Sequence, residues 1–181
     1  MNRISTTKGL AAGLAGGLAA SWVMERFQAS AGRIREKWQD EAQDALSGGP
    51  GRPPAPPPQS EEEPATVKMA TAVAEKVFHR QLEEREKAPA AEAVHYFYGA
   101  LAGGIYGMAA EHSATVRYAS GTLFAAVLWL VGDEIAVPAL HLAKGPAEYS
   151  VGTHLFALAS HVVYGTALET VRRAMRTGLL P

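Results

Sequence analysis

Acids and histidines inside otherwise uncharged segments are the residues of this chain best suited to chemistry. Asp133 and Glu134 interrupt an apolar stretch, and His154 and His161 lie seven residues apart in another. A charge at the centre of a bilayer costs about 2.5 kcal/mol or more, so such groups face a bundle interior. We therefore predict a polar or ion site drawn from the following residues: Asp133, Glu134, His154, His161, His95 and Glu169.

Pro138 follows the acidic pair closely. Proline has no N–H, so the carbonyl of Glu134 loses its usual helical partner and the helix should kink or loosen. A broken helix is tolerated in a membrane only against protein or a wet cavity. We expect the polar site here, joined by His141, His154 or His161.

A second interpretation of these residues stays open. Each histidine can serve only as a hydrogen-bonding link between helices. Glu25, Glu111 and Glu169 end apolar runs beside basic residues, which is typical of anchoring at the membrane interface.

Several classes of chemistry are disfavoured. The chain has no cysteine, which excludes disulfides, thiolate metal sites and cysteine nucleophiles. The spacing of His154 and His161 is too wide for chelation within one helical turn, so we predict neither a metal nor a cofactor. No H-E-x-x-H, G-x-S-x-G or P-loop pattern occurs, so we predict no enzyme. A net charge of −1 gives no reason to expect nucleic acid.

Four windows without Asp, Glu, Lys or Arg must position these residues: 9–24, 93–110, 118–132 and 149–168. A spanning helix needs roughly 20 mostly apolar residues, and about 17 suffice in some cases. The sequence therefore predicts an all-α integral membrane bundle of about four transmembrane helices, with the lipid bilayer as partner. The helices are expected at 1–28, 93–111, 118–142 and 150–171, the last three forming a membrane region over 92–181.

A long charged, Pro-rich loop separates the first two helices. Between Arg26 and Ala91 lie 10 of the 17 lysine and arginine residues. Within 29–91 we expect a charged helix over 29–46 that continues the first helix, then a disordered linker over 47–64. An amphipathic helix should follow over 66–86, where apolar residues recur at helical spacing.

The first segment also has the form of a signal peptide, with a basic start followed by an apolar core over 10–20. Its glycines make a weak core, so we expect retention, although cleavage stays open. An even number of spans puts both termini on the same side. Basic residues near the C-terminus favour the cytoplasm, whereas those of the loop oppose it; long loops weigh less in the positive-inside rule, so we expect cytoplasmic termini.

Two segments repeat glycine every fourth residue: Gly9, Gly13 and Gly17 in the first, and Gly99, Gly103 and Gly107 in the second. In lipid, such faces let another helix backbone approach closely. They predict either packing of the first helix on the second or a homo-oligomer.

A short internal repeat, Y-G-x-A-x-E, begins at Tyr106 and again at Tyr164. Both copies end an uncharged segment. Because alternate spans run in the same direction, the second and fourth helices should be parallel, as in a duplicated helical hairpin.

The last three helices resemble the YagU-like family of bacterial inner-membrane proteins, whose function is unknown. The resemblance rests on Val94, His95, Tyr106, Ala110 and Glu111, on 135–138 with Leu140, Gly145 and Pro146, and on His161, Glu169, Arg172, Arg173 and Arg176. It implies a multi-pass protein of the bacterial inner membrane.

Three classes of function follow. The first is a structural or accessory membrane component assembled through its glycine faces. The second is a proton- or ion-responsive protein, serving acid stress, a relay or transport, that uses Asp133, Glu134 and the intramembrane histidines. The third is a membrane enzyme, which the missing catalytic motifs disfavour.

Overall fold

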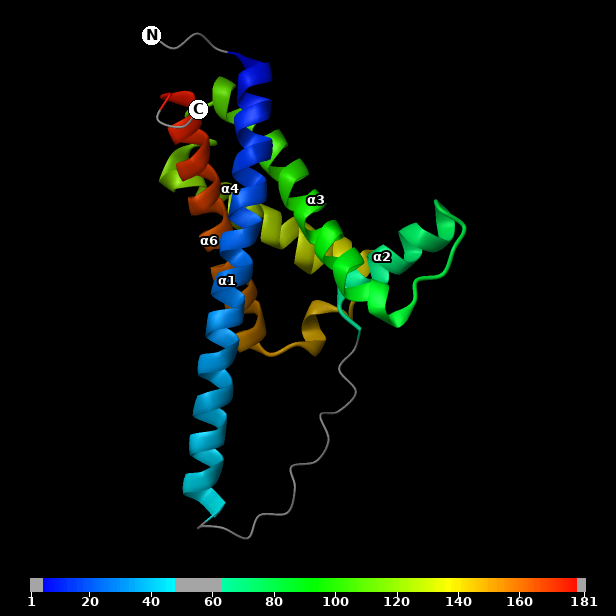
Figure 1. The fold of residues 1–181 in the computed structure, drawn as a ribbon. Coiled ribbons are helices and arrows are strands. Elements are labelled where there is room, and N and C mark those ends of the chain that lie inside the picture. The colour runs from blue at the N-terminus through cyan, green and yellow to red at the C-terminus, as the bar shows by residue number, and fades with distance from the viewer. Residues whose placement is uncertain (1–4, 48–62, 179–181) are drawn as a thin grey trace.

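A computed structural model describes residues 5–47 and 63–178. Within these ranges every regular element is helical, as predicted (Figure 1). In chain order the elements are α1 (Thr6–Ser47), α2 (Ala65–Lys76), α3 (Glu84–His112), η1 (Tyr118–Gly121), α4 (Thr122–Trp129), η2 (Leu130–Ala136), α5 (Val137–Ala139), η3 (Pro146–Glu148) and α6 (Val151–Arg176).

Helix α1 runs without a break from the first apolar segment into the charged stretch 29–46. Its 42 residues make it about 63 Å long at 1.5 Å per residue. The start of α1 and the end of α6 lie at one end of the bundle, and the C-terminal part of α1 extends beyond the other helices (Figure 1). The predicted linker over 47–64 lies mostly outside the described residues.

The prediction of an amphipathic helix over 66–86 was wrong at its C-terminal end. Helix α2 stops at Lys76, because the chain turns at His79, whose φ of 52° is left-handed. Ala70 and Ala74 are buried, but Phe78 is 68% exposed, although its spacing matched the apolar face. The helical spacing of apolar residues therefore continues past the end of α2 into a turn, so it did not mark where the helix ends.

Helix α3 begins at Glu84, well before the expected start at 93 and across the domain boundary expected at 91/92. The backbone N–H of Glu83 donates to the Glu86 carboxylate over 3.0 Å, and Arg80 pairs with the same carboxylate. These contacts, the backbone hydrogen bond foremost, lower the pKa of Glu86. The uncharged window 93–110 therefore did not mark where the helix begins, because the helical hydrogen bonds continue into the charged segment before it.

The third predicted helix, 118–142, is broken into several types of helix. A short 3₁₀ turn (η1) leads into α4, the backbone then widens into the π-helix η2, and α5 ends at Ala139. The end is three residues earlier than expected, and His141 adopts a left-handed φ of 57°. The fourth predicted helix, 150–171, is in fact longer, because α6 continues to Arg176.

Glycines bring α1 and α3 into backbone contact. A Cβ atom on Gly103 would lie 2.7 Å from the Cα of Gly17, and one on Gly107 would lie 2.8 Å from the Cα of Gly13. A Cβ on Gly9 would lie 2.6 Å from the Gly107 carbonyl oxygen. As residue numbers rise along α1 they fall along α3, so the two helices are antiparallel. The two glycine faces therefore contact each other within one chain.

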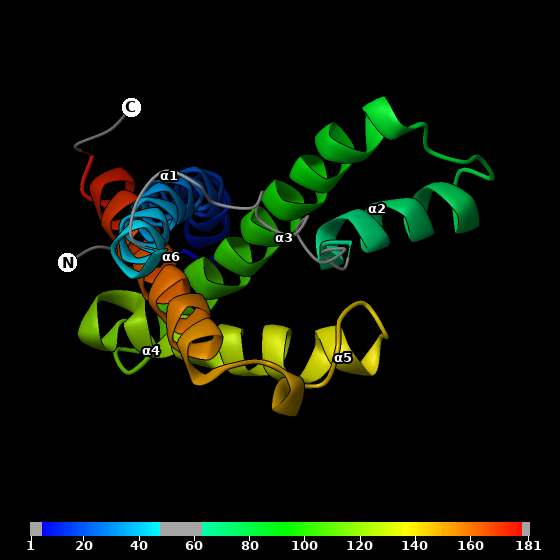
Figure 2. The ribbon, with the colours of Figure 1, turned by 90° about the horizontal axis from the view of Figure 1, so that it is seen from below.

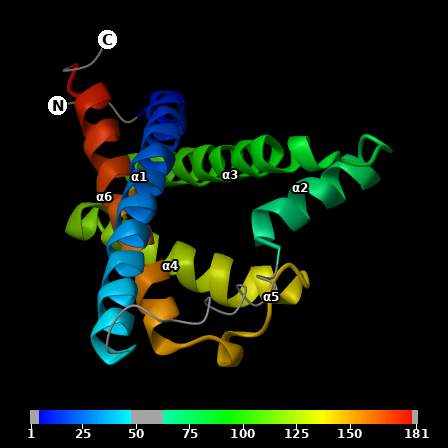
Figure 3. The same ribbon diagram turned by 60° about the horizontal axis from the view of Figure 1, so that its bottom comes forward.

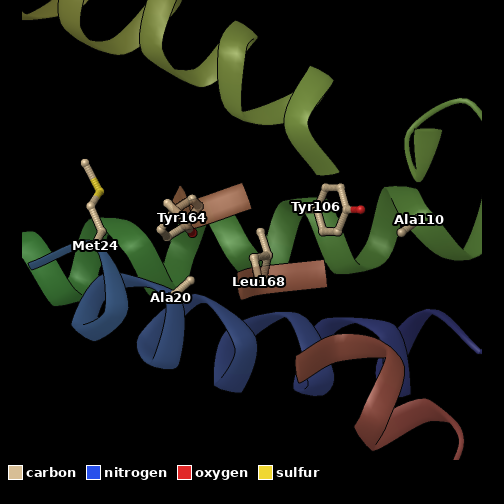
Figure 4. Packing of buried hydrophobic residues seen from close by; sticks show 6 residues of the cluster. All are labelled: Ala20, Met24, Tyr106, Ala110, Tyr164 and Leu168. Carbon is tan, nitrogen blue, oxygen red and sulfur yellow. The ribbon is translucent and has the colours of Figure 1, made fainter. Parts of the chain in front are cut away.

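Helix α6 packs against a neighbouring face of α1 and also contacts α3. Gly16 of α1 faces Leu168, and the rings of Phe27 and Phe156 stack with centroids 6.0 Å apart, which makes these helices antiparallel too. Figures 2 and 3 show α1 and α6 side by side, with α3 crossing them. The core between the three helices is small (Figure 4), and its buried members are Ala20, Met24, Tyr106, Ala110, Tyr164 and Leu168.

Large apolar side chains point outward instead. They recur every fourth residue on α1 and α3, where Leu18 is 47% exposed and Phe97 70%. Further exposed residues of this kind are Leu14, Trp22, Leu101, Ile105, Leu123, Val127, Val131, Ile135, Val151 and Leu155. By length and composition, one helical stretch among the described residues, Tyr118–Ala139, could cross a membrane.

Candidate functional site

The acidic pair lies on the π-helix η2. A π-helix pairs each N–H with the carbonyl five residues earlier, and the N–H of Val137 accordingly donates to Gly132. Pro138, which has no N–H to offer, follows directly. The loosening that the sequence predicts at Pro138 therefore takes the form of a widened helix before it, and such segments are frequent at functional sites.

Glu134 is bridged to α6 through His154. The Glu134 Oε1 atom lies 2.7 Å from His154 Nδ1, and His154 Nε2 lies 3.0 Å from the carbonyl oxygen of Pro146. Both ring nitrogens therefore face an oxygen acceptor. A neutral imidazole donates from only one nitrogen, so only the protonated ring satisfies both contacts. Helix α6 is held in place here by Ser150, whose side chain accepts a hydrogen bond from the Thr153 N–H at its first turn.

Asp133 faces the second histidine of α6. Asp133 Oδ2 lies 3.7 Å from His161 Nδ1, which is also 2.9 Å from the Ala157 carbonyl oxygen. The His161 side chain is 10% exposed, whereas Asp133 is 43% exposed. The two acids and two histidines thus form two bridges between η2 and α6, which we call the acid–histidine joint.

A pocket of about 270 Å³ opens beside this joint. Asp133, Glu134 and His154 line it, together with Lys144 and Tyr149 of the following loop. The ring of Tyr149 stands edge-on to His154, with centroids 6.3 Å apart. Sequence reasoning did not single out Lys144 or Tyr149, because a loop has no periodicity that would bring them to the acids.

Three residues of the predicted polar site lie apart from this joint: His95, His141 and Glu169. His95 stands edge-on to Tyr96 on α3, and within the described residues its buried Nε2 has no hydrogen-bond partner. His141 is exposed on the loop after α5. Glu169 lies near the other end of α6, in a cluster of its own.

That second cluster joins the ends of α3 and α6. Glu169, 1% exposed, accepts a hydrogen bond from the Tyr106 hydroxyl over 2.9 Å. It also pairs with Arg172 and Arg173, each with one N–O distance of 2.6 Å. Glu111 pairs with Arg176 over 2.8 Å. We call these residues the arginine–glutamate cluster.

The cluster uses the acids of both copies of the Y-G-x-A-x-E repeat. Contacts of Tyr164 with Gly99, of Tyr106 with Glu169 and of Glu111 with Arg176 keep a nearly constant offset, so α3 and α6 are parallel. The two repeats therefore end at the same level. The signal for this cluster was in the sequence, since arginines follow Glu169 at helical spacing of three and four.

What the acid–histidine joint can do chemically is bind and release protons near neutral pH, which is the range of the imidazole side chain. Among the described residues, no group of three or more histidines and acids is arranged to hold a metal ion. No family model, no curated protein and no solved structure matches this chain.

Proposed function

We propose that the chain is a polytopic membrane protein whose acid–histidine joint responds to protons. The observation that carries this proposal is His154, which has an oxygen acceptor at each ring nitrogen and therefore fits its site fully only when protonated. Binding a proton there strengthens the bridge between η2 and α6, because the ring then carries a positive charge against the Glu134 carboxylate.

The membrane placement is supported by the distribution of side chains. Interiors between the helices hold glycine, alanine, serine and paired charges, while leucine, isoleucine, valine and phenylalanine face outward. A water-soluble bundle has the opposite distribution.

The directions of the helices support four spans. Contacts make α1 antiparallel to both α3 and α6, and α3 parallel to α6. Gly121 at the start of α4 faces Gly165, and Glu134 further along faces His154, so α4 with η2 is antiparallel to α6. Such alternation is required of a chain that crosses a bilayer four times, with both termini on one side. The resemblance to the YagU-like family makes the bacterial inner membrane the location that we propose.

The test is to follow the joint as protons are removed. Since the chain lacks cysteine, the double variant Leu140→Cys, Val151→Cys takes spin labels only at these two exposed sites, on either side of the loop. In nanodiscs, electron–electron distance measurements should give a narrow distribution at pH 6 and a broader one at pH 9. The bridge weakens at the higher pH because the imidazole of His154 loses its proton as the solution becomes alkaline.

His154→Gln in the labelled background should abolish this pH dependence. His141→Gln is the matched control, because His141 is exposed on the same loop and takes no part in the joint. A distribution that stays constant from pH 6 to 9, or that still changes in His154→Gln, would contradict the proposal.

A structural or accessory role is a second candidate, favoured by α1. Its length of about 63 Å is twice the roughly 30 Å hydrocarbon core of a bilayer, so a long helical arm projects from the bundle. Deleting 29–47 would separate the candidates: partner capture should depend on the arm, whereas the pH response of the joint should not.

A further inference from the structure

We infer that the pocket beside the acid–histidine joint binds the zwitterionic headgroup of an ethanolamine phospholipid. The inference rests on the membrane placement proposed above, and it adds a ligand to a site so far described only by its protons. The pocket is lined by side chains of both charges.

The pocket contains acids that are incompletely paired. Among the described residues, Asp133 has one basic neighbour, His161 at 3.7 Å, and one like-charged neighbour, Glu134, and its carboxylate accepts no hydrogen bond there. Glu134 uses Oε1 for His154, and its Oε2 is likewise without a donor among the described residues. A primary ammonium group supplies three N–H donors to such oxygens.

A positive group lines the same pocket without neutralising these acids. Lys144 belongs to the lining, yet in the described structure no ion pair joins it to Asp133 or Glu134. The first residue of α2, Ala65, also lies on the wall, and the N-terminus of a helix favours anions. A ligand with both an ammonium and a phosphate group would offer the ammonium to the acids and the phosphate to Lys144 and the N-terminus of α2.

The depth of the pocket matches that of lipid headgroups. Phe156 of α6 stacks on Phe27 of α1, so the nearby His154 lies level with the end of the apolar part of α1. There Arg26 lies over the ring of Trp22, 5.8 Å from its centroid, an arginine–tryptophan pairing suited to the membrane interface. The pocket therefore faces the headgroup layer on the side opposite the termini.

Size and lining agree with this occupant. Pockets for drug-sized ligands hold roughly 300–1,000 Å³, so 270 Å³ suits a headgroup rather than a larger molecule. Val137, Pro138 and Ala157 supply apolar walls, and the Tyr149 ring is available to an ammonium group. The titratable or charged groups that line the pocket or adjoin it include Asp133, Glu134, Lys144, Tyr149, His154 and His161, with Tyr98 of α3 beside Asp133.

The test compares headgroups on the intact protein. Protein purified in detergent without ethanolamine lipid is titrated with short-chain phosphatidylethanolamine, phosphatidylcholine and phosphatidylglycerol, and binding is read by native mass spectrometry. Phosphatidylethanolamine should bind at least tenfold more tightly than the other two. The choline headgroup offers no N–H, and the glycerol headgroup has no cation. Equal affinity for all three would overturn the inference.

Two variants assign the binding to the pocket. Glu134→Gln and Lys144→Gln should each weaken phosphatidylethanolamine binding at least tenfold, whereas Glu92→Gln, an exposed acid on α3, should leave it unchanged. Lys144 is exposed, so its replacement should not disturb folding. Unchanged binding by Lys144→Gln would overturn the inference.

Soluble phosphoethanolamine distinguishes a lipid from a free ligand. It should bind at least tenfold more weakly than the lipid, because it lacks the acyl chains; equal binding would overturn the lipid as occupant. Should no headgroup bind while the spin-label distances still respond to pH, this inference fails and the proposed proton response stands.

Discussion

For Glu169, the structure indicates a different role from those predicted from the sequence. Sequence analysis offered it as a member of the polar site or as an interfacial anchor, and the structure places it, 1% exposed, between Tyr106 and two arginines. A buried carboxylate so paired remains ionised and holds its partners in place. Glu169 is therefore better understood as the link between the C-terminal ends of α3 and α6 than as a proton carrier.

Replacing Glu169 by glutamine should destabilise the bundle by up to about 3–5 kcal/mol, because Arg172, 5% exposed, would lose its close carboxylate partner and keep only Glu111, 3.4 Å away. Unfolding in detergent, followed by circular dichroism, measures this loss. Glu92→Gln removes an exposed acid from α3 and should change stability by less than about 0.5 kcal/mol. Equal stability of the two variants would show that the cluster does not hold these helices together.

At the scale of elements, the glycine faces decide how closely α1 and α3 approach. Their backbones touch at Gly13, Gly17, Gly103 and Gly107, leaving no room for a methyl group. In water, glycine weakens a helix by roughly 1 kcal/mol relative to alanine, whereas in lipid the backbone hydrogen bonds have no competitor. Glycine lowers the helix propensity of these two segments, and the same glycines allow the two helices to pack closely.

Gly103→Ala should destabilise the protein by about 1–3 kcal/mol, because its Cβ would lie 2.7 Å from the Cα of Gly17, an atom of the facing backbone. Gly32→Ala is the matched control: it lies on α1 with nothing within 4 Å of the new Cβ, and it should be neutral or stabilising by up to about 1 kcal/mol. Denaturant titration of both variants in the same detergent gives the comparison. A Gly103→Ala protein as stable as Gly32→Ala would argue against close packing of α1 on α3.

For the whole molecule, the decisive property is its inverted distribution of side chains. Many large apolar side chains are exposed, whereas the most buried residues include a glutamate, an arginine, two serines and two tyrosines. The arginine–glutamate cluster lies near the C-terminal end of α6, and the acid–histidine joint lies near its N-terminal end. Helix α6 runs along the bundle between these two levels (Figure 1). If the four helices cross a bilayer, these two polar sites face different compartments.

Single cysteines test this topology directly, since the chain has none of its own. Lys8→Cys and Thr177→Cys, both exposed at the end of the bundle with the termini, should react with a membrane-impermeant maleimide from the same side. Ile34→Cys, on the projecting part of α1, should react only from the other side. Reaction of Lys8→Cys and Thr177→Cys from opposite sides would rule out an even number of spans.

The sequence by itself determined the helical class, the uncharged segments and the residues that are hard to place in lipid, because these follow from local composition and from the period of the helix. It also contained the break before Pro138, since a missing N–H acts on neighbours along the chain. Only the tertiary structure decided that Asp133 contacts His161 and that Glu134 contacts His154. It also placed Glu169 with Glu111 in the arginine–glutamate cluster, away from this joint. Helices of similar composition can pack at many rotations and offsets, and the side-chain contacts between them select one.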